Sequence, residues 1–158
     1  MKFNSNKRIA EGLGYIWGDY IKEDLNMNLT NAVLIPVPMH PKKKSERGFN
    51  QAEVMAKSLA KKLDAAVENI LRRIHDTPPL AGLPPKERAE NLKDVFVVNK
   101  KFDVKDKICV LIDDIYTTGT SLNECAKTLK NAGAKKIICL TLTIAQKSVK
   151  SKGIIADS

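Results

Sequence analysis

Apolar residues recur at intervals of three and four residues along several stretches of the chain, which is the spacing of an amphipathic helix. The clearest predicted helix covers residues 52–63, with lysines on its opposite face. A second covers 7–24, although two glycines interrupt it, and a third covers about 120–132, closed by Gly133. In the helix over 7–24 the predicted core face comprises Ile9, Leu13, Ile16, Trp17 and Tyr20.

Short apolar runs alternate with these helices and are typical of buried strands, because they are rich in β-branched residues and end at turn residues. Strands alternating with helices predict an α/β fold whose doubly wound, mostly parallel sheet is flanked by helices on both faces. The predicted strands lie at 32–38, within 64–74, and at 95–98, 108–112 and 137–144.

Two polar segments between these elements are predicted to be loops. Residues 40–50, HPKKKSERGFN, are strongly basic. Residues 77–88, TPPLAGLPPKER, contain four prolines and a glycine, which argues against a regular element. The residues from Gln146 onward are mostly polar, and we expect them to fray.

The length of 158 residues fits one domain spanning 1–158. Apolar runs are too short for a membrane-spanning helix, and the N-terminal residues lack the apolar core of a signal peptide, so we expect a cytoplasmic protein without membrane insertion. The three cysteines, Cys109, Cys125 and Cys139, form no disulfide framework and no CxxC zinc pair.

The net charge of +9 suits an anionic partner such as nucleic acid, a phosphate ester or pyrophosphate. It fits equally well with lysine-rich helix faces that only promote solubility. Aromatic residues make up 5% of the chain, which leaves little material for stacking single-stranded nucleic acid.

The candidate chemistry follows the strand at 108–112. Asp113 and Asp114 come next, and a run of small and hydroxyl-bearing residues leads into the helix at 120. Ligands of open α/β sheets collect outside the carboxyl ends of the strands. Backbone N–H groups of such a loop and of the helix N-terminus suit a phosphate monoester, and paired carboxylates suit ribose hydroxyls or a divalent cation. The plain alternative is a βα turn without a ligand.

The segment VLIDDIYTTGTS resembles the phosphoribosyl pyrophosphate (PRPP) motif of type I phosphoribosyltransferases. This resemblance implies the type I phosphoribosyltransferase fold, with Asp113 and Asp114 holding the ribose 2- and 3-hydroxyls near Mg²⁺. It also implies a 5-phosphate loop made of Tyr116, Thr117, Thr118, Gly119, Thr120 and Ser121.

A second stretch, LIPVPMHPKKKSERGFNQ, is similar to the segment after the first strand in the ComF competence-protein family, and the likeness extends over residues 1 to about 145. It implies a pyrophosphate-binding loop after the first strand, with Lys44 and Arg47 as candidates and Arg88 reaching in from the Pro-rich segment. Solvated surface side chains are the alternative for all three. The N-terminal zinc ribbon common in that family is absent from this sequence, and Leu80 stands where the family usually has Gln.

The resemblance implies substitution at the ribose anomeric carbon of PRPP, with Mg²⁺ and basic side chains stabilising the leaving pyrophosphate. The acceptor is not identifiable from the sequence. The alternative is a protein without turnover that senses PRPP, ribose 5-phosphate or a nucleotide, or that assists DNA uptake through a competence-machinery protein or single-stranded DNA. We also expect a homodimer.

Overall fold

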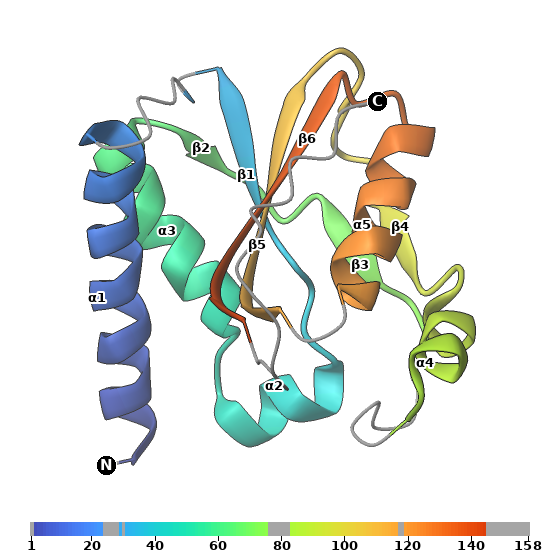
Figure 1. Cartoon of the computed structure of the whole chain (residues 1–158), viewed down its shortest axis with the longest axis horizontal. Helices are drawn as coiled ribbons and strands as arrows, with labels where there is room; N and C mark the ends of the chain where they lie inside the picture. Colours follow the sequence, from blue (N-terminus) through green and yellow to red (C-terminus); the bar gives the residue numbers. More distant parts are fainter. Residues whose placement is uncertain (1, 24–28, 30, 76–82, 117–118, 145–158) are drawn as a thin grey trace.

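The computed structural model describes residues 2–23, 29, 31–75, 83–116 and 119–144. Four strands form a central sheet, two short strands form a second sheet beside it, and helices cover both faces of the central one (Figure 1). The elements in chain order are α1 (Lys2–Glu23), β1 (Ala32–Pro36), α2 (Pro41–Arg47), α3 (Gln51–Leu63), β2 (Ala66–Val67), β3 (Leu71–Arg73), α4 (Pro85–Leu92), β4 (Phe96–Val98), β5 (Ile108–Tyr116), α5 (Thr120–Asn131) and β6 (Lys136–Ile144).

The central sheet is parallel throughout and has the order β2-β1-β5-β6. From β1 the chain crosses through α3 to β2 on one side, and from β5 it crosses through α5 to β6 on the other. The direction of winding therefore reverses between β1 and β5. Such a topological switch point opens a crevice at the carboxyl ends of the two strands.

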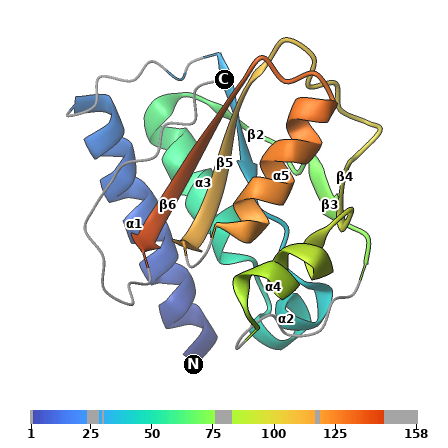
Figure 2. The same cartoon turned by 45° about the vertical axis from the view of Figure 1, so that its right-hand side comes forward.

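Successive residues of β1 and β5 alternate between two hydrophobic clusters, because side chains of a strand point to opposite faces. Ile35 and Leu111 are buried against the α5 side, together with Leu122 and Leu129 of that helix. The neighbouring residues of the same strands, including Leu34, face α3. Helices α3 and α5 lie on opposite faces of the sheet (Figure 2), which confirms the predicted doubly wound α/β architecture.

The small sheet pairs β3 with β4 in antiparallel orientation, matching Arg72 with Val97. Helix α4 lies between these strands in the chain and begins at Pro85. The prediction of a loop over 77–88 is therefore wrong for residues 85–88. Pro85 occupies the first turn of α4, where the missing N–H of proline costs nothing and its fixed φ suits a helix. Residues 77–82 lie outside the described part of the chain.

The predicted loop at 40–50 is also wrong, because residues 41–47 form helix α2. His40 caps this helix: its Nδ1 accepts a hydrogen bond from the backbone N–H of Lys42 at 3.1 Å. Pro41 begins the helix, and Gly48, with φ at 75°, ends it in the left-handed conformation. The many lysines concealed these capping signals, since they leave no apolar periodicity.

Helix α1 packs closely against α3, and two glycines permit this approach. A Cβ atom on Gly14 would lie 2.7 Å from the carbonyl oxygen of Met55, and one on Gly18 would lie 2.5 Å from Cβ of Lys62. Both distances are shorter than any normal contact. Gly14, one of the two glycines that weaken the helical pattern in the sequence, therefore determines together with Gly18 which face of α1 meets α3.

The predicted core face of α1 is consequently wrong. Ala10 and Ile21 are buried beside the two glycines, and Trp17 is half-buried. The longer apolar side chains of the predicted face point to solvent instead: Ile9, Leu13, Ile16 and Tyr20 are 59%, 38%, 65% and 47% exposed. None of the helices in the described part of the chain has the length and apolar character needed to span a bilayer.

We predict that Gly14→Ala lowers the free energy of unfolding by about 1–2 kcal/mol, because the new methyl group is forced against the backbone of α3. Gly12→Ala is the matched control, since a Cβ there meets nothing within 4 Å. That control should instead raise stability by about 0.5–1 kcal/mol through its helix propensity. Urea unfolding of both variants measures this, and equal effects of the same sign would contradict the packing of α1 on α3.

Candidate functional site

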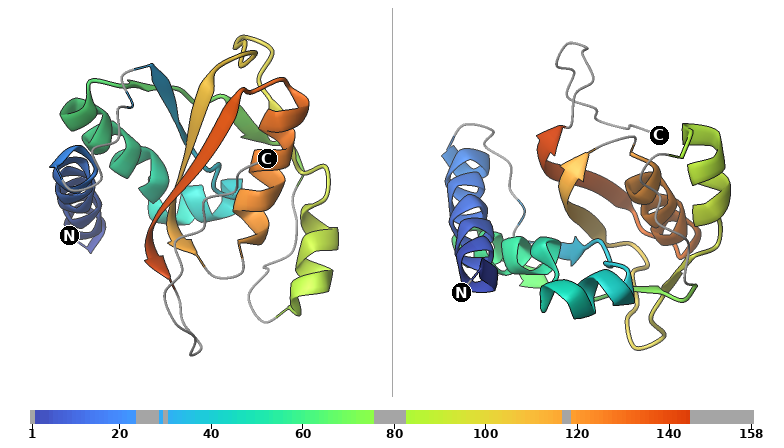
Figure 3. Two further views of the ribbon diagram at one scale, coloured as in Figure 1. Left: turned by 45° about the horizontal axis from the view of Figure 1, so that its top comes forward. Right: turned by 90° about the horizontal axis from the view of Figure 1, so that it is seen from below.

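The carboxyl ends of β1 and β5 lie side by side at one edge of the sheet, at the switch point (Figure 3). The backbone N–H of Val37 donates to the carbonyl oxygen of Ile112 at 2.9 Å, so the pairing of these strands continues past the end of β1. Helix α2 follows β1 at this edge, and α5 begins here after β5. The topology thus brings together the basic segment and the acidic pair that the sequence singled out.

The acidic pair lies within β5, which continues to Tyr116 rather than ending at 112. Asp113 and Asp114 are both half-buried, and the backbone N–H of Asp114 donates to Oδ1 of Asp113 at 2.9 Å. Since Ile112 belongs to the cluster facing α3, the alternation of the strand directs Asp113 to the α5 side. This placement agrees with the influence of its charge on Cys125 of α5, whose pKa is raised first by burial and then by Asp113.

Burial, followed by the negative charge of Asp114, raises the pKa of Asp113 to about 7. The hydrogen bond from the backbone N–H of Asp114 acts against these effects. The fold therefore holds an acidic group that is unstable in its ionised form near neutral pH. Hydroxyl donors or a cation at this position would favour the ionised form.

Gly119 forms the entry to α5 and is buried, with φ at 70°. A Cβ atom there would lie 2.7 Å from Cε2 and from the hydroxyl oxygen of Tyr116, so glycine is required by both backbone and space. Gly119 offers no side chain to cap α5. The first backbone N–H groups of this helix and the positive end of its dipole are therefore suited to an anion. Thr120 and Ser121 are half-buried in this first turn, whereas Thr117 and Thr118 lie outside the described residues.

Asn50 is a structural anchor of the site that the sequence reasoning did not identify. Its side chain donates from Nδ2 to the carbonyl oxygen of Val37 at 3.0 Å and accepts from the backbone N–H of Ala52 at 3.1 Å. It thereby caps α3 and fixes the segment after β1 at the same time. The signal was available, because Asn directly before a helical apolar pattern is a typical N-cap.

The three predicted pyrophosphate residues lie in different surroundings, and their roles remain predictions. Arg47 is exposed at the end of α2, and its guanidinium donates to the side-chain oxygen of Gln51. Lys44 is also exposed and lies 3.9 Å from a carboxylate oxygen of Glu53. Arg88 is a residue of α4, and its side chain lies outside what the structure describes.

A cleft of about 760 Å³ lies between α1, the end of α2 and the length of α3 as far as Lys61. Glu53 lies in this cleft, and its pKa is lowered chiefly by its hydrogen bond with Lys57. Four lysines, two glutamates and two aromatic residues contribute to the lining of the cleft. The full set of lining residues is Lys7, Glu11, Tyr15, Lys44, Gly48, Phe49, Asn50, Glu53, Val54, Lys57, Ser58 and Lys61.

The family of the chain follows from comparison with known proteins. Residues 50–154 match the phosphoribosyl transferase domain. Competence protein F of Haemophilus influenzae is 36% identical over 106 residues, which is 66% of this chain and 46% of that protein. The chain belongs to the ComF family of the phosphoribosyltransferase superfamily.

Two further relatives are similar to the chain over different lengths. DNA utilization protein YhgH of Escherichia coli K12 is 27% identical over 152 residues, or 91% of this chain and 65% of that protein. Competence protein ComFC of Bacillus subtilis is 31% identical over 64% of this chain and 39% of its own length. The chain thus spans between about two fifths and two thirds of the length of these relatives.

Solved structures of phosphoribosyltransferases share the fold. A hypoxanthine phosphoribosyltransferase from Staphylococcus aureus superposes with a TM-score of 0.52 at 13% identity, covering 85% of this chain and 62% of that one. A purine phosphoribosyltransferase from Pyrococcus horikoshii gives a TM-score of 0.50 at 20% identity, covering 85% and 72%. The ComF chain therefore has the type I phosphoribosyltransferase fold that its PRPP-like motif implied.

We predict that Asp113→Asn stabilises the protein above neutral pH. The folded pKa of about 7 exceeds the ordinary 3.8, so the folded state holds more protons between these values, and stability falls as pH rises through them. A shift of this size corresponds to roughly 4 kcal/mol at full ionisation. The gain from Asn should reach a few kcal/mol above pH 7 and vanish below pH 4, measured by urea unfolding across pH.

Asp94→Asn is the control for this experiment, because Asp94 is exposed and its φ of 57° is tolerated by Asn. It measures what replacing an exposed aspartate by asparagine does to stability. If the free energy of unfolding of Asp113→Asn differed from that of the wild type by the same amount at every pH from 4 to 8, a raised pKa of Asp113 would be contradicted.

Proposed function

We propose that the chain binds the ribose 5-phosphate part of PRPP at the switch point and that Asp113 and Asp114 hold the ribose hydroxyls. The observation that carries this proposal is the position of the acidic pair near the end of β5, five residues before Gly119 at the start of α5. Carboxylates accept hydrogen bonds from vicinal hydroxyls, and the helix N-terminus accepts a phosphate. The hydroxyls of one ribose 5-phosphate would thus contact the acidic pair, and its phosphate would contact the start of α5.

The raised pKa of Asp113 supports a ligand of this chemistry. A carboxylate that is costly to ionise in the free protein gains the most when hydroxyl donors or a cation arrive. Binding should therefore release protons from Asp113 near neutral pH. It would also remove the destabilisation that the pair causes in the free protein.

The residues present fit Mg²⁺ that arrives with the substrate. The described part of the chain holds no cluster of three or more His, Cys, Asp or Glu side chains arranged for a metal ion. Mg²⁺ in proteins is often bound through one or two carboxylates together with substrate phosphates, and Asp113 and Asp114 would be those carboxylates. When bound, the ion would stabilise the negative charge of the leaving pyrophosphate.

Transfer of the phosphoribosyl group with release of pyrophosphate is the reaction that we propose for this site. Arg47 is the best placed of the candidate cations to contact pyrophosphate, because it ends α2 and its guanidinium can bind phosphoryl oxygens bidentately. Its hydrogen bond is to the neutral Gln51 side chain, and within the described residues no carboxylate forms an ion pair with it. The same cradle would serve a protein that senses PRPP without turnover.

Calorimetric titration with PRPP and Mg²⁺ tests the proposed site. The wild type should bind, and Asp113→Asn/Asp114→Asn should lower the affinity at least tenfold, about 1.4 kcal/mol or more, while Asp94→Asn should bind as the wild type does. Because Asp113→Asn is expected to stabilise the fold, its loss of binding would not reflect unfolding. Absence of wild-type binding would refute the proposal.

Release of pyrophosphate separates transferase from sensor. The wild type is incubated with Mg²⁺, PRPP and a panel of nucleobases and amines. A protein that binds PRPP but releases no pyrophosphate with any acceptor would support sensing. Release that Asp113→Asn/Asp114→Asn abolishes would support transfer.

A second candidate function is binding of single-stranded DNA along the cleft between α1 and α3. Its lining combines four lysines with the exposed ring of Tyr15 and the half-buried Phe49. Lys62 lies beside this aromatic ring, with Nζ 5.5 Å from the centre of the Tyr15 ring, and forms an ion pair with Asp19 at 2.8 Å. In cationic grooves of this kind, the basic side chains bind the sugar–phosphate backbone of single-stranded DNA, and the bases stack on the aromatic side chains. Names such as DNA utilization protein, borne by relatives, fit this chemistry.

Lys7→Glu/Lys61→Glu should weaken binding of a fluorescent oligothymidylate at least tenfold. The slope of log affinity against log salt concentration should become less steep by about 1.4, the value for two lost phosphate contacts on a single strand. Lys100→Glu/Lys101→Glu, two exposed lysines after β4, is the charge-matched control. Equal affinities of the two variants would contradict binding in the cleft. Asp113→Asn/Asp114→Asn should retain DNA binding, which separates the two candidate functions.

A further inference from the structure

The segment between β1 and α3 is closed by one buried side chain. Within the described part of the chain, Asn50 and Ser58 are the polar residues that are buried, and Asn50 is 8% exposed. Buried polar side chains are normally satisfied by hydrogen bonds. Asn50 has a partner for each end of its amide, donating to the carbonyl oxygen of Val37 and accepting from the backbone N–H of Ala52. The bond to Val37 joins residues 13 positions apart, so residues 38–49 form a closed loop.

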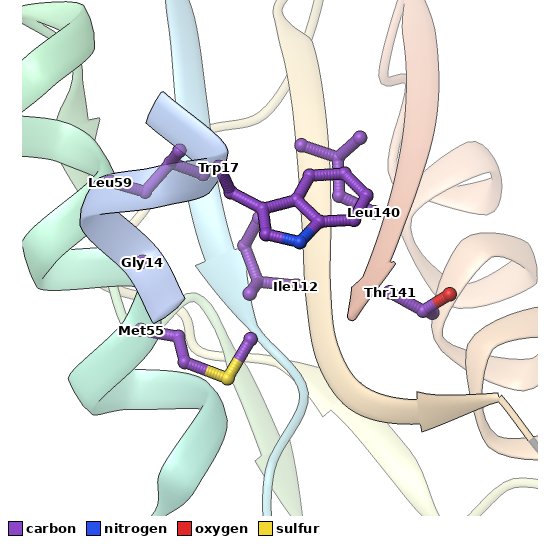
Figure 4. Close-up of a pocket in the computed structure, with 7 residues that line it drawn as sticks. All are labelled: Gly14, Trp17, Met55, Leu59, Ile112, Leu140 and Thr141. Carbon is purple, nitrogen blue, oxygen red and sulfur yellow. The ribbon is translucent and has the colours of Figure 1, made fainter. Parts of the chain in front are cut away.

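Val37 is a fixed point for this loop. Its backbone N–H donates to the carbonyl oxygen of Ile112 at 2.9 Å, and its side chain is buried in the cluster on the α5 side. On the other face of the sheet, Ile112 lines an apolar pocket together with Trp17 and Leu140 (Figure 4). Since backbone pairing and burial hold Val37 in the sheet, the bond from Asn50 ties the start of α3 to the carboxyl end of β1.

Helix α2 lies within the closed loop, and both of its ends are capped by groups of the loop itself. Nδ1 of His40 accepts from the backbone N–H of Lys42 at the first turn. The backbone N–H of Gly48 donates to the carbonyl oxygen of Lys44 at 2.8 Å at the last turn. The helix has seven residues, and helices of this length are unstable in isolation. The position of α2 therefore depends on the groups that fix the two ends of the loop.

The closed loop carries a concentration of positive charge. Residues 38–49 contain four basic side chains and a single carboxylate, which are Lys42, Lys43, Lys44, Arg47 and Glu46. The guanidinium of Arg47 donates to the side chain of Gln51, the residue that follows Asn50. The start of α3 thus holds Val37 through Asn50 and Arg47 through Gln51.

We propose that Asn50 is a positioning residue for the pyrophosphate half of the site. It holds α2, and with it Arg47, in a fixed place beside the carboxyl end of β1, without touching the ligand itself. A loop that is ordered in advance binds more tightly, because the ligand does not have to order it. This inference rests on the proposed function, since it concerns the same substrate.

The ribose half of the site is built without Asn50. Asp113 and Asp114 are residues of β5, and the proposed phosphate contact is the start of α5. Asn50 instead bonds within the segment that joins β1 to α3. Loss of its bond to Val37 should therefore weaken binding of pyrophosphate and leave ribose 5-phosphate nearly unaffected. General damage to the fold would weaken both ligands.

Asn50→Asp separates the two hydrogen bonds of this side chain. An ionised carboxylate still accepts from Ala52 and caps α3, but it has no N–H to donate to Val37. Calorimetric titration with Mg²⁺ should show pyrophosphate weakened at least tenfold and ribose 5-phosphate less than twofold. Asn99→Asp is the matched control, because Asn99 also accepts from a backbone N–H two residues later, at 3.3 Å, and lies outside the loop. The control should bind both ligands as the wild type does.

Hydrogen exchange measures the effect on the loop without any ligand. The amides of Lys44 and Gly48, which are bonded across α2, should exchange at least tenfold faster in Asn50→Asp, relative to the amides of β5. Unchanged exchange in α2, unchanged affinity for pyrophosphate, or equal weakening of both ligands would overturn the positioning role. A wild type that binds ribose 5-phosphate but not pyrophosphate would overturn it too. Failure of the wild type to bind either ligand would refute the proposed function itself, and the pyrophosphate role with it.

Discussion

The parallel pairing of β1 with β5 is the interaction on which the rest of the structure depends. These two strands contribute buried residues to both hydrophobic clusters, and their register places Pro36 beside Ile112, one residue before the acidic pair. Since the chain winds outward in opposite directions from them, the crevice at their carboxyl ends is free of a crossover connection. Helix α2 after β1 and the start of α5 after β5 therefore lie at the same edge of the sheet, although about 70 residues separate them in the chain.

The site departs from what stability alone would favour. A core strand normally ends in apolar or neutral residues, yet β5 continues through two adjacent aspartates, one of which has its pKa raised to about 7. The buried glycine at 119 and the uncapped start of α5 add further groups that a ligand could satisfy. Proteins commonly retain such unfavourable arrangements where function requires them. Stability lost at one edge is offset by the two clusters that cover the sheet.

The central sheet and the PRPP-like motif could be predicted from the sequence because both are local. The apolar runs of β1, β5 and β6 and the period of α3 each lie within a dozen residues, and the resemblance of the strand–acid–loop segment identified the family. The errors arose where a tertiary contact decides the outcome. Gly14 turned α1 so that its larger apolar residues face solvent, and His40 and Gly48 formed caps around a lysine-rich helix that lacks apolar periodicity. No local signal indicates that Asn50 bonds across the loop to Val37.

The central claim is that one ribose phosphate contacts both the acidic pair and the start of α5. Chemical-shift mapping by ¹⁵N NMR, with ribose 5-phosphate and Mg²⁺ added to the labelled protein, measures this directly. The account predicts that the largest changes occur at the amides of Asp114, Gly119, Thr120 and Ser121, with small changes along α1. Changes confined to the cleft between α1 and α3, or no changes at saturating ligand, would contradict it.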